Sequence, residues 1–152
     1  MLKTRRRASL SLAAAALVLC ATACDERLSD LTGPTPDLQP TFSSIQSEIF
    51  EATDSSGRPP CTSCHNTVFA RFNGNLDLSH AAAYANLVNT ASRDKAGAIR
   101  VIPGDPTNSY LIHKLTGAPG IVGQQMPING PYLSSGQIAV IRHWIETGAR
   151  ND

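Results

Sequence analysis

The chain has 152 residues, of which 41% are hydrophobic, 5% aromatic and 16% charged. This length suits one globular domain with appendages and leaves no room for a second domain of ordinary size. After residue 24, nine basic and twelve acidic residues remain, a net charge near −3, and no cluster of Lys and Arg is found among them. The composition therefore argues against a partner made of nucleic acid.

Residues 1–23 have the features of an export signal. A basic start (Lys3 and the arginines at 5–7) precedes "LSLAAAALVLCA", an apolar run shorter than a membrane span, and small residues follow in "ATAC". The segment "LCATAC" resembles a bacterial lipobox, in which Cys24 would be acylated and would anchor the chain to a membrane. Because "ATA" also fits ordinary A-x-A cleavage, both outcomes stay open. In either case the mature protein is expected in the bacterial cell envelope, either periplasmic or membrane-anchored.

Residues 24–41 are polar, contain three prolines and lack apolar periodicity, which predicts a flexible tether. The folded domain is then expected over residues 42–152. Within this range Cys61 and Cys64 are the only thiols, so no disulfide framework can be built.

Four segments of the domain have helical periodicity, and none alternates like a strand. The longest connection, 117–131, is rich in Gly and Pro, and loops of such length are usually functional. The pattern predicts an all-α domain. The four expected helices are 42–50, before Gly57 and Pro59; 79–89, with Ser79 as its cap; 104–117, capped by Asp105 and ended by Gly117; and 133–149, with Ser134 and Gln137 as a capping box and Gly148 as its stop.

The sequence "PPCTSCHNT" contains C-x-x-C-H, the attachment sequence for c-type haem. On one helical turn Cys61 and Cys64 project from the same side, so both can form thioethers to one edge of a porphyrin. His65 can then bind the iron. One covalently held haem would also supply the flat apolar surface that the few aromatic residues do not provide.

Three other interpretations of the motif are weaker. Structural zinc needs four ligands, and no second Cys or Cys/His pair exists. A thioredoxin-like redox site is expected within a βαβ pattern, which is absent from the sequence. A local disulfide between Cys61 and Cys64 stays open, but it leaves the following histidine unexplained.

The second axial ligand is expected to be Met126. It is the only methionine besides Met1, and Pro127 stiffens its loop. His80 is the alternative, because it lies at helical spacing from Tyr84 and Leu87 and is expected on their apolar side. By the same argument His113 and His143 are expected to point to solvent.

The segments "CTSCH", "LDLS", "VIPGDPTNSYLIHKL", "QMP" and "LSSGQIAVIRHWIETGA" together resemble the planctomycete-type cytochrome c domain, over most of residues 45–149. The resemblance implies a cytochrome c-like bundle of about four to five helices around one covalent haem, with crossing N- and C-terminal helices. It carries thioether roles onto Cys61 and Cys64, and axial roles onto His65 and Met126. Ile128 departs from the family, which often has a second proline there.

These observations predict a monohaem cytochrome that transfers electrons and is not itself an enzyme. It is expected to act as a monomer with redox partner proteins and, through Cys24, with a membrane. Arg100 is a candidate partner for a haem propionate, although a solvated surface charge explains it equally well. The alternative is a haem enzyme or sensor whose distal site is open or ligated by His80.

Overall fold

The computed structural model describes residue 35 and residues 37–152, so the expected signal segment, Cys24 and most of the tether lie outside the described residues. In this part of the chain there are helices and loops but no strand, apart from isolated bridges between Val88 and Val101 and between Ala91 and Ile99. The all-α prediction is confirmed at this level. The elements are α2 (Phe42–Ile45), η1 (Gln46–Phe50), η2 (Cys61–Ser63), η3 (Ala70–Phe72), α3 (Ala83–Leu87), α4 (Tyr110–Thr116) and α5 (Ser135–Glu146).

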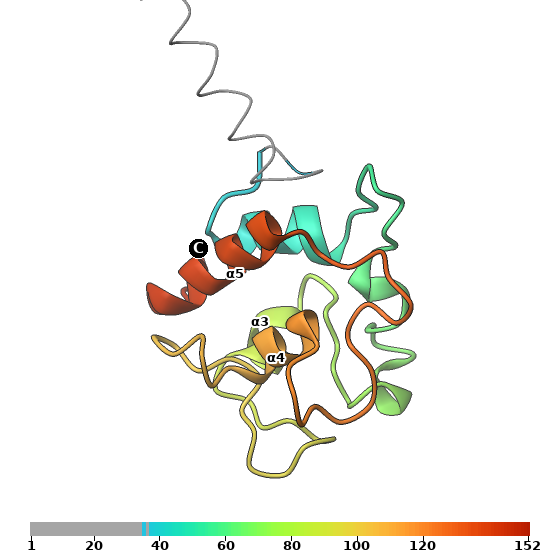
Figure 1. Cartoon of the computed structure of the whole chain (residues 1–152), viewed down its shortest axis with the longest axis vertical. Helices are drawn as coiled ribbons and strands as arrows, with labels where there is room; N and C mark the ends of the chain where they lie inside the picture. Colours follow the sequence, from blue (N-terminus) through green and yellow to red (C-terminus); the bar gives the residue numbers. More distant parts are fainter. Residues whose placement is uncertain (1–34, 36) are drawn as a thin grey trace, which may run out of the picture.

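The first and last helical segments lie side by side at one end of the domain (Figure 1). α2 continues directly into η1, a π-helical turn, so the predicted helix 42–50 is confirmed. The ring centroid of Phe42 lies 5.6 Å from that of Trp144 on α5. The N-cap of α5 is a complete capping box, in which Ser134 accepts from the Gln137 amide and Gln137 accepts from the Ser134 amide.

The second predicted helix is shorter than expected. α3 begins only at Ala83 with Ala82 as its N-cap, so Ser79 does not cap it, and the Ser79 hydroxyl donates to Asp77. The Ser79 carbonyl accepts from the amides of residues 82 and 83, so residues 79–82 form a turn that precedes the helix. Ser and Asp side chains commonly stabilise such turns at the expense of helix.

The start of the third predicted helix is also wrong. The Asp105 carboxylate accepts from the Asn108 amide and closes a separate turn, and α4 begins five residues later at Tyr110. Its predicted end is confirmed, since Gly117 is the C-cap in the left-handed region, at φ +66°. Glycine adopts this conformation without the steric cost that a side chain brings.

The packed part of the chain begins before residue 42. Leu38 is only 4% exposed and belongs to the core, and Thr35 is likewise buried. The end of the expected tether therefore lies against the domain. Two amides at the start of α2, those of Phe42 and Ser43, also donate to the carboxylate and the carbonyl of Asp152, at 2.9 Å each.

The core joins residues of every α-helix. No helix in the described part of the chain is long and apolar enough to cross a membrane. The main fully or nearly fully buried apolar side chains are Ile45, Ile49, Phe50, Leu87, Val101, Ile112, Ile141, Trp144 and Ile145.

Candidate functional site

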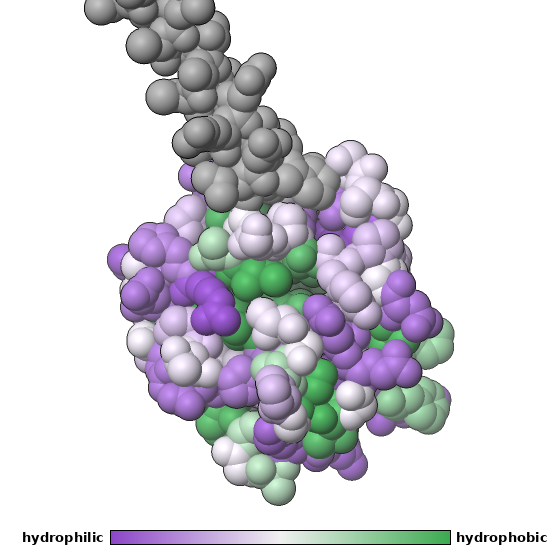
Figure 2. All heavy atoms as spheres, in the orientation of Figure 1, coloured by the Kyte–Doolittle hydropathy of each residue, from purple (hydrophilic) through white to green (hydrophobic). Residues whose placement is uncertain are grey.

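A cavity of about 510 Å³ lies beside the core, which is a typical volume for a ligand or cofactor pocket. Its walls are mostly apolar and come from segments far apart in the chain. On the side of the domain drawn in Figure 2, apolar side chains are visible in a hollow between polar ones. The lining includes Cys61, Cys64, His65, Arg100 and Met126, so the structure brings these five predicted residues to one cavity.

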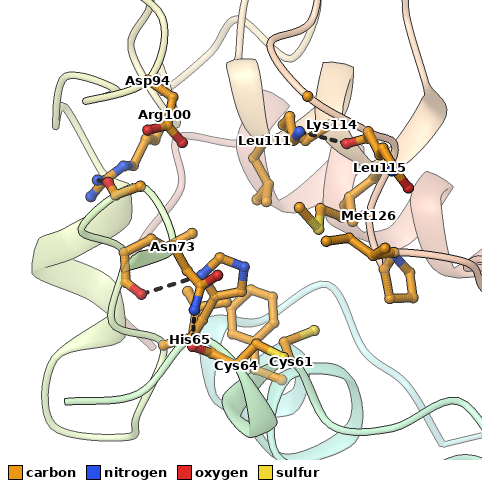
Figure 3. A pocket seen from close by; sticks show the side chains of 18 of the residues that line it. Cys61, Cys64, His65, Asn73, Asp94, Arg100, Leu111, Lys114, Leu115 and Met126 are labelled. Atoms are coloured by element: carbon orange, nitrogen blue, oxygen red, sulfur yellow. Dashed lines mark hydrogen bonds between the residues drawn. The ribbon is translucent and has the colours of Figure 1, made fainter. Parts of the chain in front are cut away.

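The two cysteines lie on a single helical turn. The amides of Cys64 and His65 both donate to the Cys61 carbonyl, at 3.2 and 2.9 Å. Thr62 fixes this turn against the end of η1 by donating to the Phe50 carbonyl at 3.2 Å. Both cysteines are free thiols in the structure, so the disulfide that the sequence left open is not formed. Both cysteines of this turn, three residues apart in the sequence, line the cavity (Figure 3).

The imidazole of His65 is oriented by a hydrogen bond to the backbone. Its Nδ1 lies 3.3 Å from the Leu76 carbonyl, which can only accept, so this contact favours the tautomer with the proton on Nδ1 and a lone pair on Nε2. Burial lowers the pKa of His65, although the Leu76 bond opposes this effect. A neutral imidazole with a free Nε2 is the form that binds metal.

Met126 reaches the cavity from the long loop between α4 and α5, and its side chain points inward (Figure 3). Two hydrogen bonds tie this loop to the last turn of α4. The Met126 amide donates to the Lys114 carbonyl at 2.8 Å, and Gln125 Nε2 donates to the Leu115 carbonyl at 2.8 Å. The loop passes close to Gly117, where a Cβ would lie 2.7 Å from Gln125 Oε1. The methionine is therefore held by fixed backbone.

His80 is not on the apolar side of a helix, and this prediction is wrong. Its side chain is 81% exposed and lies 3.7 Å from Glu51, outside the cavity lining. The error follows from the missing helical turn, since residues 79–82 do not have the assumed helical phase. His143 is exposed, and His113 turns to the Thr107 carbonyl, so His65 is the only histidine among the described residues that lines the cavity.

Arg100 is buried rather than solvated. It is 7% exposed, and its guanidinium donates to the backbone carbonyls of Asn86, Gly74 and Asn75 at 2.6, 2.7 and 3.1 Å. Burial lowers the pKa of Arg100, and the negative charge of nearby Asp94 opposes this effect. Most of its N–H groups thus hold two segments of the cavity wall together.

A buried ion pair that was not predicted from the sequence lies behind the cysteines. Arg58 Nε donates to Asp54 Oδ2 at 3.0 Å, and the two side chains are 0% and 1% exposed. Arg58 Nη1 also donates to the Ile49 carbonyl at 3.0 Å and lies 4.0 Å from Cys61 Sγ. The signal in the sequence was the i, i+4 spacing of opposite charges directly before the motif.

A second missed residue is Lys114. Its ammonium donates to the carbonyls of Val122 and Gln124 in the long loop, at 2.8 and 2.5 Å. Its pKa is lowered by burial and raised again in part by Asp94. The side chain shapes the loop that carries Met126.

The donor set fits a haem better than a bare metal ion. In residues 35 and 37–152 no group of three or more His, Cys, Asp or Glu side chains is arranged to hold a metal ion. A haem iron takes four ligands from its porphyrin and needs at most two from the protein, and the His65 imidazole and the Met126 thioether are of the types that could supply them. The two thiols and the apolar walls suit the porphyrin itself.

Comparisons of this chain with models of protein families, with curated proteins and with solved structures find no match.

Proposed function

We propose that this protein is a monohaem c-type cytochrome that carries electrons in the bacterial cell envelope, similar to the planctomycete-type cytochrome c domain. One observation carries the proposal: a single cavity is lined by Cys61, Cys64 and His65 from one turn and by Met126 from a distant loop. The spacing of the motif and the apolar walls of the cavity support the same assignment.

Each residue has a separate task in this proposal. Cys61 and Cys64 would hold the porphyrin through two thioethers, and the His65 Nε2 atom and the Met126 sulfur would bind the iron. The Leu76 carbonyl fixes the imidazole, and the bonds of residues 125 and 126 to α4 fix the thioether. The bound haem supplies one-electron chemistry by cycling between ferric and ferrous iron.

The surroundings of Met126 favour electron transfer over catalysis. Leu111 and Leu115 lie beside Met126 and offer no proton donor or acceptor, whereas Asp94 lies on the other side of the cavity, near Arg100 (Figure 3). Lys114 and Tyr110 also line the cavity, but Lys114 donates to two loop carbonyls and Tyr110 accepts from the Val122 amide. A haem enzyme that transforms a small molecule would need a general acid or base near the iron, on the side where Met126 lies. The exposure of His80 removes the one candidate that the sequence offered.

The remaining parts of the proposal concern location and partners. The basic, apolar and small-residue order of residues 1–24 supports export, and the lipobox-like "LCATAC" supports a lipid on Cys24. A tethered monomer would exchange electrons with redox proteins of the envelope.

The test is the visible spectrum of the protein after expression with a cytochrome maturation system. We expect covalent haem that survives denaturing electrophoresis, and a weak far-red band of the ferric protein that reports methionine sulfur on iron. C61A/C64A should lose the covalent haem. A wild-type protein without haem would overturn the proposal, and haem without the far-red band would point to an open distal site.

Met126→Ala should raise carbon monoxide binding to the reduced protein, because it opens the sixth position. Ile128→Ala is the matched control, since this exposed residue lines the same cavity from the same loop but offers no ligand atom. Equal binding by wild type and M126A would remove Met126 from the iron.

A further inference from the structure

Arg58 is a completely buried cation directly behind the cysteine turn. The residue is 0% exposed and does not line the cavity. Its Nη1 atom donates a hydrogen bond to the Ile49 carbonyl. The Cys61 thiol donates to the same carbonyl, with Sγ at 3.5 Å. The guanidinium and the first thiol thus share one acceptor and lie 4.0 Å apart. Guanidinium keeps its proton under all ordinary conditions, so this charge is permanent.

The charge of Arg58 is balanced only on one side. Asp54 accepts from its Nε atom and backbone amide, and Ser56 and Gln137 also donate to that carboxylate. Arg58 Nη2, in contrast, is buried and has no hydrogen-bond partner among the described residues. The pair is therefore a fixed dipole. Its negative end, the Asp54 carboxylate, lies at Arg58 Nε, and its positive end includes Arg58 Nη1, which lies next to Cys61.

The orientation of this dipole matters at Cys61. Burial raises the pKa of the Cys61 thiol, and the positive charge of Arg58 is the strongest effect in the opposite direction. The field of Arg58 is therefore felt at the atom that would join the porphyrin. Inside the protein this field is screened much less than the field of a surface charge.

We propose that Arg58 raises the reduction potential of the haem site through its buried positive charge beside Cys61, and that Asp54 moderates this effect. This inference rests on the proposed function, since it concerns a haem held by Cys61. Reduction of ferric iron adds one electron and lowers the net charge of the site by one unit. A fixed positive charge nearby stabilises the reduced form, and a fixed negative charge disfavours it.

A purely structural role for the pair makes a different prediction. Removal of either partner would then loosen the same packing and shift the potential in the same direction. An electrostatic role predicts opposite signs for the two partners, with the larger shift for Arg58, whose charge contacts Cys61 directly.

The experiment is a redox titration of the haem-loaded full chain. Arg58→Gln should lower the ratio of ferrous to ferric protein at a fixed applied potential by on the order of tenfold. For one electron this corresponds to a reduction potential lower by about 59 mV. Asp54→Asn should raise it by less. Arg58→Lys keeps the cation and should restore most of the wild-type value. Arg150→Gln removes an exposed charge elsewhere and should leave the potential unchanged within a few millivolts, because solvent screens it.

The double variant D54N/R58Q covers the case in which a single variant does not fold. It leaves no unpaired buried charge and should still lower the potential, by less than R58Q alone. Shifts of the same sign for R58Q and D54N, or an unchanged potential in the double variant, would overturn the inference while the haem spectrum of the wild type still stands. Absence of haem from the wild type would instead overturn the proposed function.

Discussion

The domain has two regions that are stabilised in different ways. In the first, α2, η1 and α5 pack through apolar side chains, and Trp144, Ile141 and Ile145 of α5 are all 0% or 1% exposed. In the second, the cavity walls at residues 61–80 and 117–133 contain little helix. There, polar side chains hold the loops by donating to backbone carbonyls.

Arg100, Lys114 and Gln125 show how the second region is held. Together they donate to six carbonyls, four in the loops, one in α3 and one in α4. A loop has no neighbouring strand or helical turn to satisfy its backbone, so a buried side chain must supply the missing partner. Burial of apolar surface thus determines the fold, whereas a few side-chain hydrogen-bond donors determine the shape of the site.

Trp144→Ala should have the largest effect on stability and would test the packed region. Loss of the indole leaves a void beside Phe42 and frees the Arg150 carbonyl, which Nε1 binds at 2.8 Å. We expect the free energy of unfolding in urea to fall by about 3–5 kcal/mol. Val68→Ala, at a position 65% exposed, is the control and should change it by less than about 0.5 kcal/mol. A loss below about 1 kcal/mol for W144A would contradict the packing argument.

Arg100→Lys should have the next largest effect and would test the loop region. Lysine keeps the charge but cannot reach three carbonyls in a fixed plane, so at least one buried acceptor loses its donor. We expect a loss of about 1.5–3 kcal/mol in the same assay, together with faster amide exchange in residues 74–76. Arg93→Lys, at a neighbouring exposed position, should match the wild type. If both variants behave alike, the carbonyl contacts of Arg100 contribute little.

Acid should weaken the junction between the regions through Asp54. Burial raises the pKa of this carboxyl, but bonds from Ser56, Arg58 and Gln137 and the charge of Arg58 outweigh it and lower the pKa below 3.8. The stabilisation is therefore complete above that value and is lost as pH falls through the lower, folded value. Unfolding midpoints between pH 7 and pH 2 should show this loss, reduced in D54N and retained in D37N. Equal slopes for the two variants would exclude Asp54 as a major contributor.

Ser134→Ala should have the smallest effect on the free energy of unfolding and would test how much the start of α5 contributes to the packed region. It removes the hydroxyl that accepts from the Gln137 amide at 3.1 Å, and a lost N-cap costs about 1 kcal/mol. Ser135→Ala, one residue later and exposed, should be neutral within about 0.5 kcal/mol in thermal or urea unfolding.

The packed region could be predicted from the sequence because its signals are local. The apolar spacing of 42–50 and the capping box of Ser134 each act within one or two turns, and the structure has both. The glycine at 117, in the second region, is an equally local signal and ends α4. The helix starts at Ser79 and Asp105 were wrong for a physical reason. Both residues stabilise turns with side-chain hydrogen bonds, which compete with helical ones.

The residues of the cavity were predictable by type but not by position. Cys61, Cys64 and His65 form a local motif, and Met126 was the single methionine of the domain, so both could be named without a fold. The donors that shape the walls could not. Arg100 contacts Gly74 across 26 residues and Lys95 contacts Gly120 across 25, and no periodicity in the sequence encodes such pairs. His80 received a role that its exposed position does not support, because residues 79–82 do not have the assumed helical phase.

The contacts of the cysteine turn also bear on the order in which the domain can assemble. Cys61 and Thr62 bond to carbonyls only twelve residues earlier, so this part of the site is complete in the chain long before Met126 is synthesised. The methionine loop is tied to α4 by two hydrogen bonds and supplies the opposite wall from residues that are synthesised later. Under the proposed function, the cysteines would thus be open to a large attachment enzyme before the loop of Met126 packs, and the attached group would help to order that loop.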